Sequence, residues 1–513
     1  MLSEGRARLR ELLHIFCAGH LFFVVYWVYF KLGDFYFFQG DDVGRLVRAQ
    51  AWSRHPSFMP YAGWLPLPCY LTGTLLKAFH DPYVAPLIWG GIMTTAVLLL
   101  LGLIAGELFP DEPETMLAAP LLALAVPFFE KAGLSAGSEI VMWLFVLANL
   151  YAWLLFRRTG LQRWFWLSCA ALICASMTRY EAWLYNAAFL AVTAREARVT
   201  ALRRWSYCAA SLSCVVVFAI YVERHMPPSP SAIASLPLSY AGVRLLWNFS
   251  SGFPEGVVDR SFAAPIRAFW AMGPLGAACG LLGAAGCIVA FFRKGLPARY
   301  AAFAFLCFAA LCAEAAIFGF SGSIPQRLVV IFPLLTAPLS ARLILSPAPP
   351  RRRAAVVLAL ALLCAAWMSS IMPRDRMSER HELRSPYVAA RATRAAEMEG
   401  GFAAAYSLGP LPEGENSPLG FAALDRRVSW ETLSPEISGP VWITATDRAG
   451  ARRIGAWADP VAEIGTVAIF ARGIPASGIA ACRRQAARWF SSYPAAGAEA
   501  MPERRGEDGL PSE

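Results

Sequence analysis

The sequence predicts an α-helical polytopic membrane protein of about eleven transmembrane helices, followed by a small α/β domain outside the membrane. Three observations support this fold class. Only 16% of the 513 residues are charged and 57% are hydrophobic, whereas soluble domains carry about 25% charged residues. Apolar runs of helix length recur as far as residue 372, with short arginine clusters between them. Beyond residue 372 the chain is richer in charge, Gly and Pro, and strand-like runs appear.

The transmembrane domain, residues 1–372, is predicted from apolar runs, because a helix needs roughly 20 apolar residues to cross a bilayer. The first run, Leu12 to Phe30, is too long and too aromatic for a signal-peptide core, and no small-residue cleavage site follows it, so we expect a retained span. The candidate spans are residues 12–31, 83–108, 116–129, 139–156, 164–178, 183–194, 205–222, 263–292, 298–320, 325–345 and 354–371.

The arginine clusters predict the orientation, because basic loops stay on the cytoplasmic side. Clusters lie at residues 6–10, 157–163, 195–204, 293–299 and 351–353. They require residues 164–194 to form two short spans, since one long helix would place its flanking clusters on opposite sides. The N-terminus is then inside, and the 33–81 loop, the 223–262 loop and the tail are outside. The acidic loop 110–114 falls on the cytoplasmic side, which is acceptable because acidic residues weigh little in the rule.

The tail divides into an extracytoplasmic α/β domain, residues 373–495, and a polar segment, residues 496–513, that we expect to be disordered. Strand-like runs at Phe402–Ser407, Val441–Thr446 and Thr466–Ala471 alternate with helix-compatible stretches such as 383–398. The location predicted for the whole chain is the cytoplasmic (inner) membrane of a bacterium.

Composition also excludes some functions. The net charge of +10 comes from short arginine clusters between spans, which indicates membrane topology and not nucleic-acid binding. The twelve cysteines lie mostly inside apolar runs without the paired spacing of a zinc site, and the histidines are scattered. The Gly-rich segment 273–286 is typical of a closely packed membrane helix and not of a phosphate-binding loop.

The first outer loop holds the most informative cluster of residues. Asp41 and Asp42 are adjacent, and Arg45, Arg48 and Trp52 share one face of a short helix that we expect to run to about Trp52 and to lie flat on the bilayer. A carboxylate pair can act as a base, and arginines can grip a phosphate on a lipid. The alternatives are a helix N-cap for one Asp and snorkelling to lipid headgroups for the arginines.

Further candidates lie on the same predicted side. Trp64 precedes a proline-rich, non-helical bend and is a substrate-binding candidate, or else an interfacial anchor. Glu139 begins a span, where it also suits the helix dipole. Arg179, Tyr180 and Glu181 interrupt an apolar stretch, which usually marks function; the alternative is an internal ion pair that holds the bend.

Arg327 is the last candidate. It opens an apolar span on the outer side, and an arginine at a helix start opposes the helix dipole. An anionic group therefore has to compensate its charge. That group is either a phosphate or a carboxylate from another loop.

Together these motifs resemble the GT-C superfamily of integral-membrane glycosyltransferases, in particular bacterial relatives of protein O-mannosyltransferases and of the lipid A aminoarabinose transferase. The resemblance covers about residues 10–370. It rests on Asp41-Asp42, on the run from Asp42 to Arg48-Ala49, on Thr178-Arg179-Tyr180-Glu181-Ala182-Trp183, and on Pro325-Gln326-Arg327 leading to Ile331-Phe332-Pro333. Two positions depart from the family pattern: Asp42 replaces the usual Glu, and Leu328 follows Arg327 in place of Tyr.

The resemblance implies a sugar donor on polyprenyl phosphate and a transfer that inverts the anomeric carbon. Asp41 or Asp42 would be the general base toward an acceptor hydroxyl of protein, glycan or lipid. Donor phosphate would be bound by arginines, which make a metal dispensable without excluding one; no cofactor is required. The arginine candidates are Arg45, Arg48, Arg179 and Arg327, and the substrate-binding candidates are Trp64, Glu139, Tyr180 and Glu181.

Other functions remain open at this level. A transporter or flippase of lipid-linked saccharides would be expected to show internal repeats, and none is found in the sequence. A ligase of lipid-linked glycans would use a similar donor. A non-catalytic envelope scaffold would retain an Asp if that residue only capped a helix.

Overall fold

A computed structural model describes the chain in segments separated by gaps. The described residues are 45–46, 48–49, 52–53, 55–58, 65–79, 84–126, 129–134, 137–194, 196, 199–225, 258–259, 261–293, 295–318, 320–321, 329–378, 404–408, 441–445, 460–464, 467–472 and 474–491. The predictions for the first span, for most of the 223–262 loop, for the 383–398 helix and for the final segment lie outside these residues. The chain divides into two compact units, residues 1–378 and 379–513.

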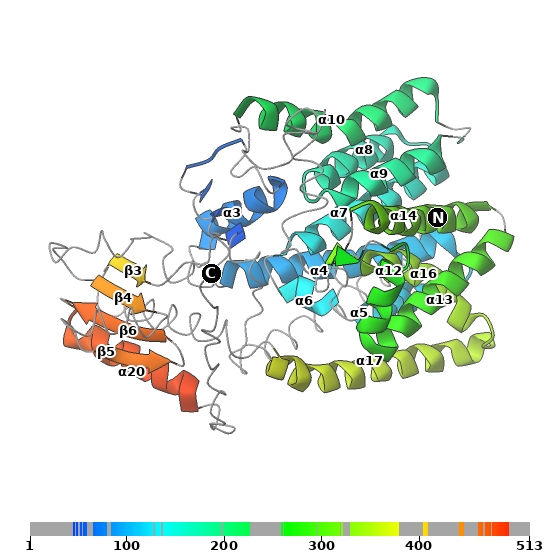
Figure 1. Ribbon diagram of the computed structural model, residues 1–513. Helices are drawn as coiled ribbons and strands as arrows, with labels where there is room; N and C mark the ends of the chain where they lie inside the picture. Colours follow the sequence, from blue (N-terminus) through cyan, green and yellow to red (C-terminus); the bar gives the residue numbers. More distant parts are fainter. Residues whose placement is uncertain are drawn as a thin grey trace, which may run out of the picture. The chain divides into compact units, whose positions relative to one another are not determined.

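The first unit is a helical bundle (Figure 1). Its helices are α3 (Leu67–Phe79), α4 (Val84–Leu108), α5 (Thr115–Leu124), α6 (Phe129–Leu134), α7 (Ser138–Thr159), α8 (Gln162–Ser176), α9 (Glu181–Thr193), α10 (Ala201–His225), α12 (Ala264–Ala271), α13 (Gly273–Phe292), α14 (Gly295–Phe318), α16 (Ile331–Leu345) and α17 (Pro350–Ser378). Two-residue strands β1 (Val258–Asp259) and β2 (Phe320–Ser321) pair antiparallel.

Five helices among the described residues are long and apolar enough to cross a membrane. They are Ile88–Leu108, Ser138–Thr159, Ala201–Tyr221, Gly273–Phe292 and Gly295–Ala316. The predicted multi-pass helical fold is therefore confirmed, while the count of about eleven spans stays a prediction.

The predicted division of residues 164–194 into two helices is also confirmed. α8 ends at Ser176 and α9 begins at Glu181, with a tight turn between them. The chain reverses there, so the basic segments on either side of this hairpin lie at the same end of the bundle. Arg203 of α10 accordingly donates a hydrogen bond to Gln162 of α8 over 3.1 Å.

Two predicted boundaries were wrong. Residues 263–292 are not one span, because α12 and α13 are separate helices that meet at Gly273, whose φ of +83° lies in the left-handed region. The outer loop 33–81 also contains a helix that we did not predict, α3, and Pro68 lies in its first turn, where a proline is tolerated. The bend predicted around Trp64 therefore stops before Leu67.

The bundle core is large and aromatic. α7 packs against α4 and α8, and α16 packs against α5 and α13. The largest fully buried side chains include Trp143, Trp153, Phe165, Phe189 and Tyr207. Because such rings bury much apolar surface and contact one another in edge-to-face or tilted pairs, they fix the relative positions of α7, α8, α9 and α10.

The second unit contains a four-stranded sheet in the order β3-β4-β6-β5 (Figure 1). Its strands are β3 (Ala404–Leu408), β4 (Val441–Ala445), β5 (Pro460–Ile464) and β6 (Val467–Arg472), and helix α20 (Ala476–Ser491) follows them. β3 and β4 are parallel and the other pairs are antiparallel. Three of these strands coincide with the predicted runs. Arg483 of α20 donates a hydrogen bond to the Val461 carbonyl over 3.0 Å, which ties the helix to β5.

Candidate active site at the Arg179 end of the bundle

The turn between α8 and α9 brings several predicted site residues together. Thr178 closes the turn, because its hydroxyl donates to the Ala175 carbonyl over 2.6 Å. Arg179 follows, and α9 then starts with Glu181, an acidic residue that suits a helix N-terminus. α7 starts beside this turn with Ser138 and Glu139. We call this part of the bundle the Arg179 end.

Arg179 is bound by side chains from two helices. Its Nε and Nη2 donate to the two oxygens of Glu181 over 3.0 and 2.7 Å. Its Nη1 donates to Glu139 Oε1 over 2.6 Å and to Ser138 Oγ over 3.0 Å. The exposed fractions of the Arg179, Glu139 and Glu181 side chains are 11%, 4% and 9%. One guanidinium thus holds two carboxylates in a site that water reaches poorly.

A third carboxylate lies near this pair. Glu314, close to the end of α14, interacts electrostatically with Glu181 and Arg179. Its residue exposure is 7%, and its Oε2 atom has no hydrogen-bond partner among the described residues. Carboxylates therefore outnumber arginines in this described cluster, which suits the binding of hydroxyl or cationic groups better than the binding of a phosphate.

In the described structure Arg179 forms the internal ion pairs that the sequence analysis gave as the alternative to phosphate binding. Four N–H···O contacts already engage its guanidinium with Ser138, Glu139 and Glu181. If Arg179 also bound the donor phosphate, some of these hydrogen bonds would have to break. We therefore assign Arg179 first to holding Glu139 and Glu181 in place.

Tyr180 lies in an aromatic group next to the ion pairs. Its ring meets the Trp183 ring edge to face at 5.1 Å and the Phe218 ring at 5.7 Å. Leu65, just before α3, is buried in the same group. The backbone N–H of Leu67 donates to the Met177 carbonyl over 3.0 Å. The first outer loop is therefore attached to the Arg179 turn.

The arginines of the first outer loop lie on a helical segment, as predicted. Arg45, Arg48 and Trp52 are all helical, and Arg45 is buried at 9% exposure. The intervening Leu46 and Ala49 are fully buried. The segment therefore packs against other parts of the protein. We had expected it to lie flat on the bilayer.

α3 provides the packing surface for this segment. The Trp52 ring lies 5.1 Å from the Tyr70 ring, and the Trp52 side chain and the Ala49 carbonyl leave no room for a Cβ at Gly73. Arg48 is close enough to Cys69 to lower the pKa of its thiol, although burial has the larger effect and raises that pKa to about 12. Since α3 also contacts the Arg179 turn, Arg48 and the Arg179 cluster belong to one region.

Four predicted site residues, Asp41, Asp42, Trp64 and Arg327, lie outside the described residues, and their roles stay predictions.

Sequence reasoning missed Glu314. A signal was present, because it is the one charged residue in the sequence between Arg299 and Arg327, and an ionisable side chain in a predicted span marks a functional candidate. Within the described part of the chain, no three His, Cys, Asp or Glu side chains are grouped to hold a metal ion.

Comparison with solved structures is informative about the fold. ArnT from Cupriavidus metallidurans bound to undecaprenyl phosphate matches with a TM-score of 0.58 and 12% identity, over 91% of this chain and 98% of that chain. The chain has the GT-C fold. The helical membrane fold that the GT-C resemblance predicted is thus confirmed. The apo form of the same ArnT matches with a TM-score of 0.42 and 13% identity, over 92% of this chain and 98% of that chain.

Sequence comparison finds a match between part of this chain and one protein family. The profile of the family described as dolichyl-phosphate-mannose-protein mannosyltransferase matches residues 55–222. This range contains α3, both short helices α8 and α9, and the Arg179 cluster except for Glu314. No curated protein matches the sequence significantly.

Proposed function

We propose that this protein is a membrane glycosyltransferase that moves a sugar from a polyprenyl-phosphate donor to an acceptor hydroxyl on the outer face of the cytoplasmic membrane. The observation that carries the proposal is the GT-C fold over 91% of the chain, shared with a protein whose structure contains undecaprenyl phosphate. The family match over residues 55–222 supports the same reaction class. The carboxylate-rich Arg179 cluster, within reach of the first outer loop, supplies the polar groups that such a site needs.

In the proposed reaction, Asp41 or Asp42 removes the proton from the acceptor hydroxyl. The acceptor oxygen forms a new bond to the anomeric carbon, the bond from that carbon to the phosphate oxygen breaks, and the configuration inverts. Polyprenyl phosphate leaves with the bonding electron pair. Arg45, Arg48 and Arg327 stabilise its added negative charge, because bidentate arginines suit phosphate oxygens.

The Arg179 cluster would act on the sugar side of the reaction. The carboxylates of Glu139 and Glu181 are acceptors for sugar hydroxyls, and Tyr180 and Trp64 remain the predicted aromatic contacts to the sugar ring. Glu314 adds a third carboxyl group to the cluster. A second anion, the donor phosphate, is then favoured on the Arg45 and Arg48 side of the site and disfavoured beside the carboxylates.

The proposed orientation places the Arg179 end outside and the opposite end of the bundle in the cytoplasm. The opposite end carries ion pairs of Arg157 and Arg299 with Glu196 (2.9 and 2.8 Å) and of Arg158 with Glu107 (2.7 Å). We call it the basic end. Excess arginine at one end of a bundle favours its retention in the cytoplasm.

The acidic loop 110–114 also forms salt bridges at the basic end. Arg342 pairs with Glu112 at 2.9 Å, and Arg353 approaches Glu114 at 3.8 Å. The acidic residues of this loop thus face arginines of α16 and α17. This pairing supports the cytoplasmic placement that we proposed for the loop in spite of its charge.

The test measures release of polyprenyl phosphate from a panel of radiolabelled polyprenyl-phosphate sugars by purified protein in detergent. Asp41→Asn and Asp42→Asn are compared with wild type and with Asp111→Asn, an exposed carboxylate of the 110–114 loop. We expect one Asn variant of the pair to lose at least a hundredfold in rate while its melting temperature and the Asp111→Asn activity stay unchanged. Full activity in both Asp41→Asn and Asp42→Asn would refute the proposal that one of these residues is the general base.

A further inference from the structure

A small pocket opens at the basic end, away from the proposed transfer site. It is lined by the ends of four helical segments: Phe109 after α4, Val289 and Arg293 at the end of α13, Pro297 in α14, and Leu339 to Ser346 at the end of α16. It is small and open to the surroundings. A pocket of this kind admits only a small group, so the rest of any larger ligand would lie outside it.

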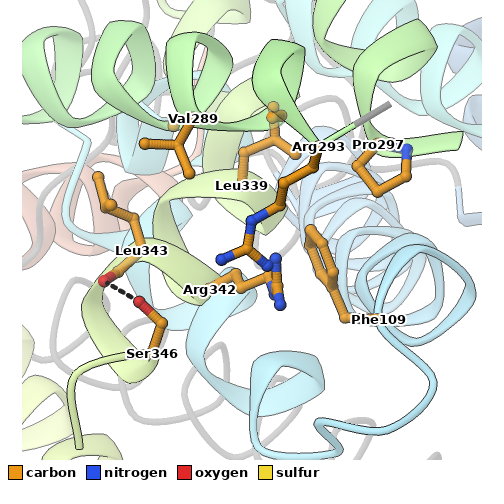
Figure 2. A pocket seen from close by; sticks show the side chains of 10 residues that line it. Phe109, Val289, Arg293, Pro297, Leu339, Arg342, Leu343 and Ser346 are labelled. Carbon is orange, nitrogen blue, oxygen red and sulfur yellow. Dashed lines mark hydrogen bonds between the residues drawn. The ribbon is translucent and has the colours of Figure 1, made fainter. Parts of the chain in front are cut away.

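The pocket combines two arginines with one carboxylate. Arg342 donates from Nε and Nη2 to Glu112 over 3.1 and 2.9 Å, and its guanidinium lies 4.8 Å from the centre of the Phe109 ring. Arg293 reaches from the end of α13 toward Arg342 and Phe109 (Figure 2). Glu112 balances one of the two charges, so the pocket keeps an excess positive charge.

The surface next to the pocket is apolar. On α13, which is a candidate span, Ile288 and Phe292 are 58% and 84% exposed, and Val289 of the same surface also lines the pocket. Exposed apolar side chains of this size on a membrane helix face hydrocarbon. A ligand of the pocket would therefore place an anionic group beside Arg293 and a hydrocarbon chain along α13.

We propose that this pocket binds the phosphate headgroup of an anionic phospholipid of the bilayer. The chemistry supports a lipid, because the cationic pocket and the exposed apolar face of α13 are continuous at the end of a membrane helix. Basic pockets between transmembrane helices on the cytoplasmic side recognise such headgroups. The bound lipid would link α13, α14 and α16 at the basic end and stabilise their packing. The proposal does not depend on the transfer reaction.

The test uses full-length protein that has been delipidated in detergent. Its melting temperature is followed while phosphatidylglycerol, phosphatidylcholine or inorganic phosphate is added at constant ionic strength. We expect phosphatidylglycerol to raise the melting temperature and the other two to have little effect. In Arg293→Gln, the apparent affinity for phosphatidylglycerol should fall about fivefold, the effect of one basic residue near anionic lipid.

The matched control is Arg351→Gln, which removes an exposed arginine at the same end of the bundle without changing the pocket. It should keep the wild-type response. An equal loss in both variants would mean that general surface charge attracts the lipid, and the pocket proposal would be wrong. A full response to inorganic phosphate would overturn the lipid as the source of the anion. Equal responses to phosphatidylglycerol and phosphatidylcholine would overturn the anionic headgroup.

Discussion

At the Arg179 end a single buried guanidinium is shared by two carboxylates, whereas at the basic end several partly exposed arginines surround single acids. Arg179 is 11% exposed, while Arg158, which pairs with Glu107, is 46% exposed. Both ends contain short ion pairs, so distance does not distinguish them. Burial does, because water screens an exposed pair and cannot replace a partner that is lost from a buried one. We therefore expect the two ends to respond very differently to the same substitution.

The largest expected effect comes from removing Arg179. Arg179→Met leaves Glu139 and Glu181 as uncompensated buried carboxylates, which should cost about 3–5 kcal/mol. Arg158→Met removes a half-exposed arginine and strands one carboxylate, Glu107, in place of two, so it should cost less. Unfolding in detergent, followed by tryptophan fluorescence, measures both.

Two results decide this comparison. Adding Glu139→Gln and Glu181→Gln to Arg179→Met should restore part of the lost stability, because the stranded charges are then gone. Similar losses for Arg179→Met and Arg158→Met would contradict the view that burial separates the two ends.

A medium effect is expected where the first outer loop packs on α3. A Cβ at Gly73 would overlap the Trp52 ring and approach the Ala49 carbonyl, so Gly73→Ala should destabilise by about 1–3 kcal/mol. Trp52→Leu opens space, and the double variant should lose less than the two single losses added together. Limited proteolysis within residues 33–81 measures whether the loop has loosened. Additive losses would show that the two residues do not share this contact.

The smallest effect concerns reactivity and leaves stability unchanged. Burial raises the pKa of Cys69 to about 12, and the thiolate is the form that reacts with iodoacetamide. Alkylation of Cys69 should therefore be slow at pH 8 and still be increasing at pH 10–11. Because Arg48 lowers this pKa, Arg48→Gln should slow the reaction further. Site-resolved mass spectrometry measures the rate, and a plateau near pH 9 would contradict the packing of Arg48 and Cys69.

The helical hairpin of α8 and α9 could be predicted because topology rules act over long distances. Arginine clusters on both sides of residues 164–194 required the chain to return, and this located the turn at Arg179. The boundary at Gly273 was missed because hydropathy is continuous across α12 and α13. A backbone signal was present, since Gly273 precedes Pro274 and such dipeptides mark turns.

The sequence marked Arg179, Glu139 and Glu181 as candidates, but it did not predict which of them pair. Arg179 and Glu181 are neighbours in sequence, so an ion pair between them was an explicit alternative. The contact with Glu139 spans 40 residues and depends on how α7 packs against α8 and α9. Glu314 comes from α14, far along the chain, and only the tertiary structure brings it to this end. Long-range packing of this kind leaves no local pattern in the sequence.

Helix α7 sets a length scale for the surrounding bilayer. Glu139, paired with Arg179, and Arg157, paired with Glu196, lie on α7 about 27 Å apart at 1.5 Å per residue. Ion pairs resist immersion in hydrocarbon, so this spacing acts as a gauge of hydrophobic thickness, close to the roughly 30 Å of an average membrane. Bilayers with longer acyl chains must thin around the protein or tilt it. The bundle is thereby matched to a bilayer of about average thickness, and the acyl-chain length of the surrounding lipids should influence how the protein sits in it.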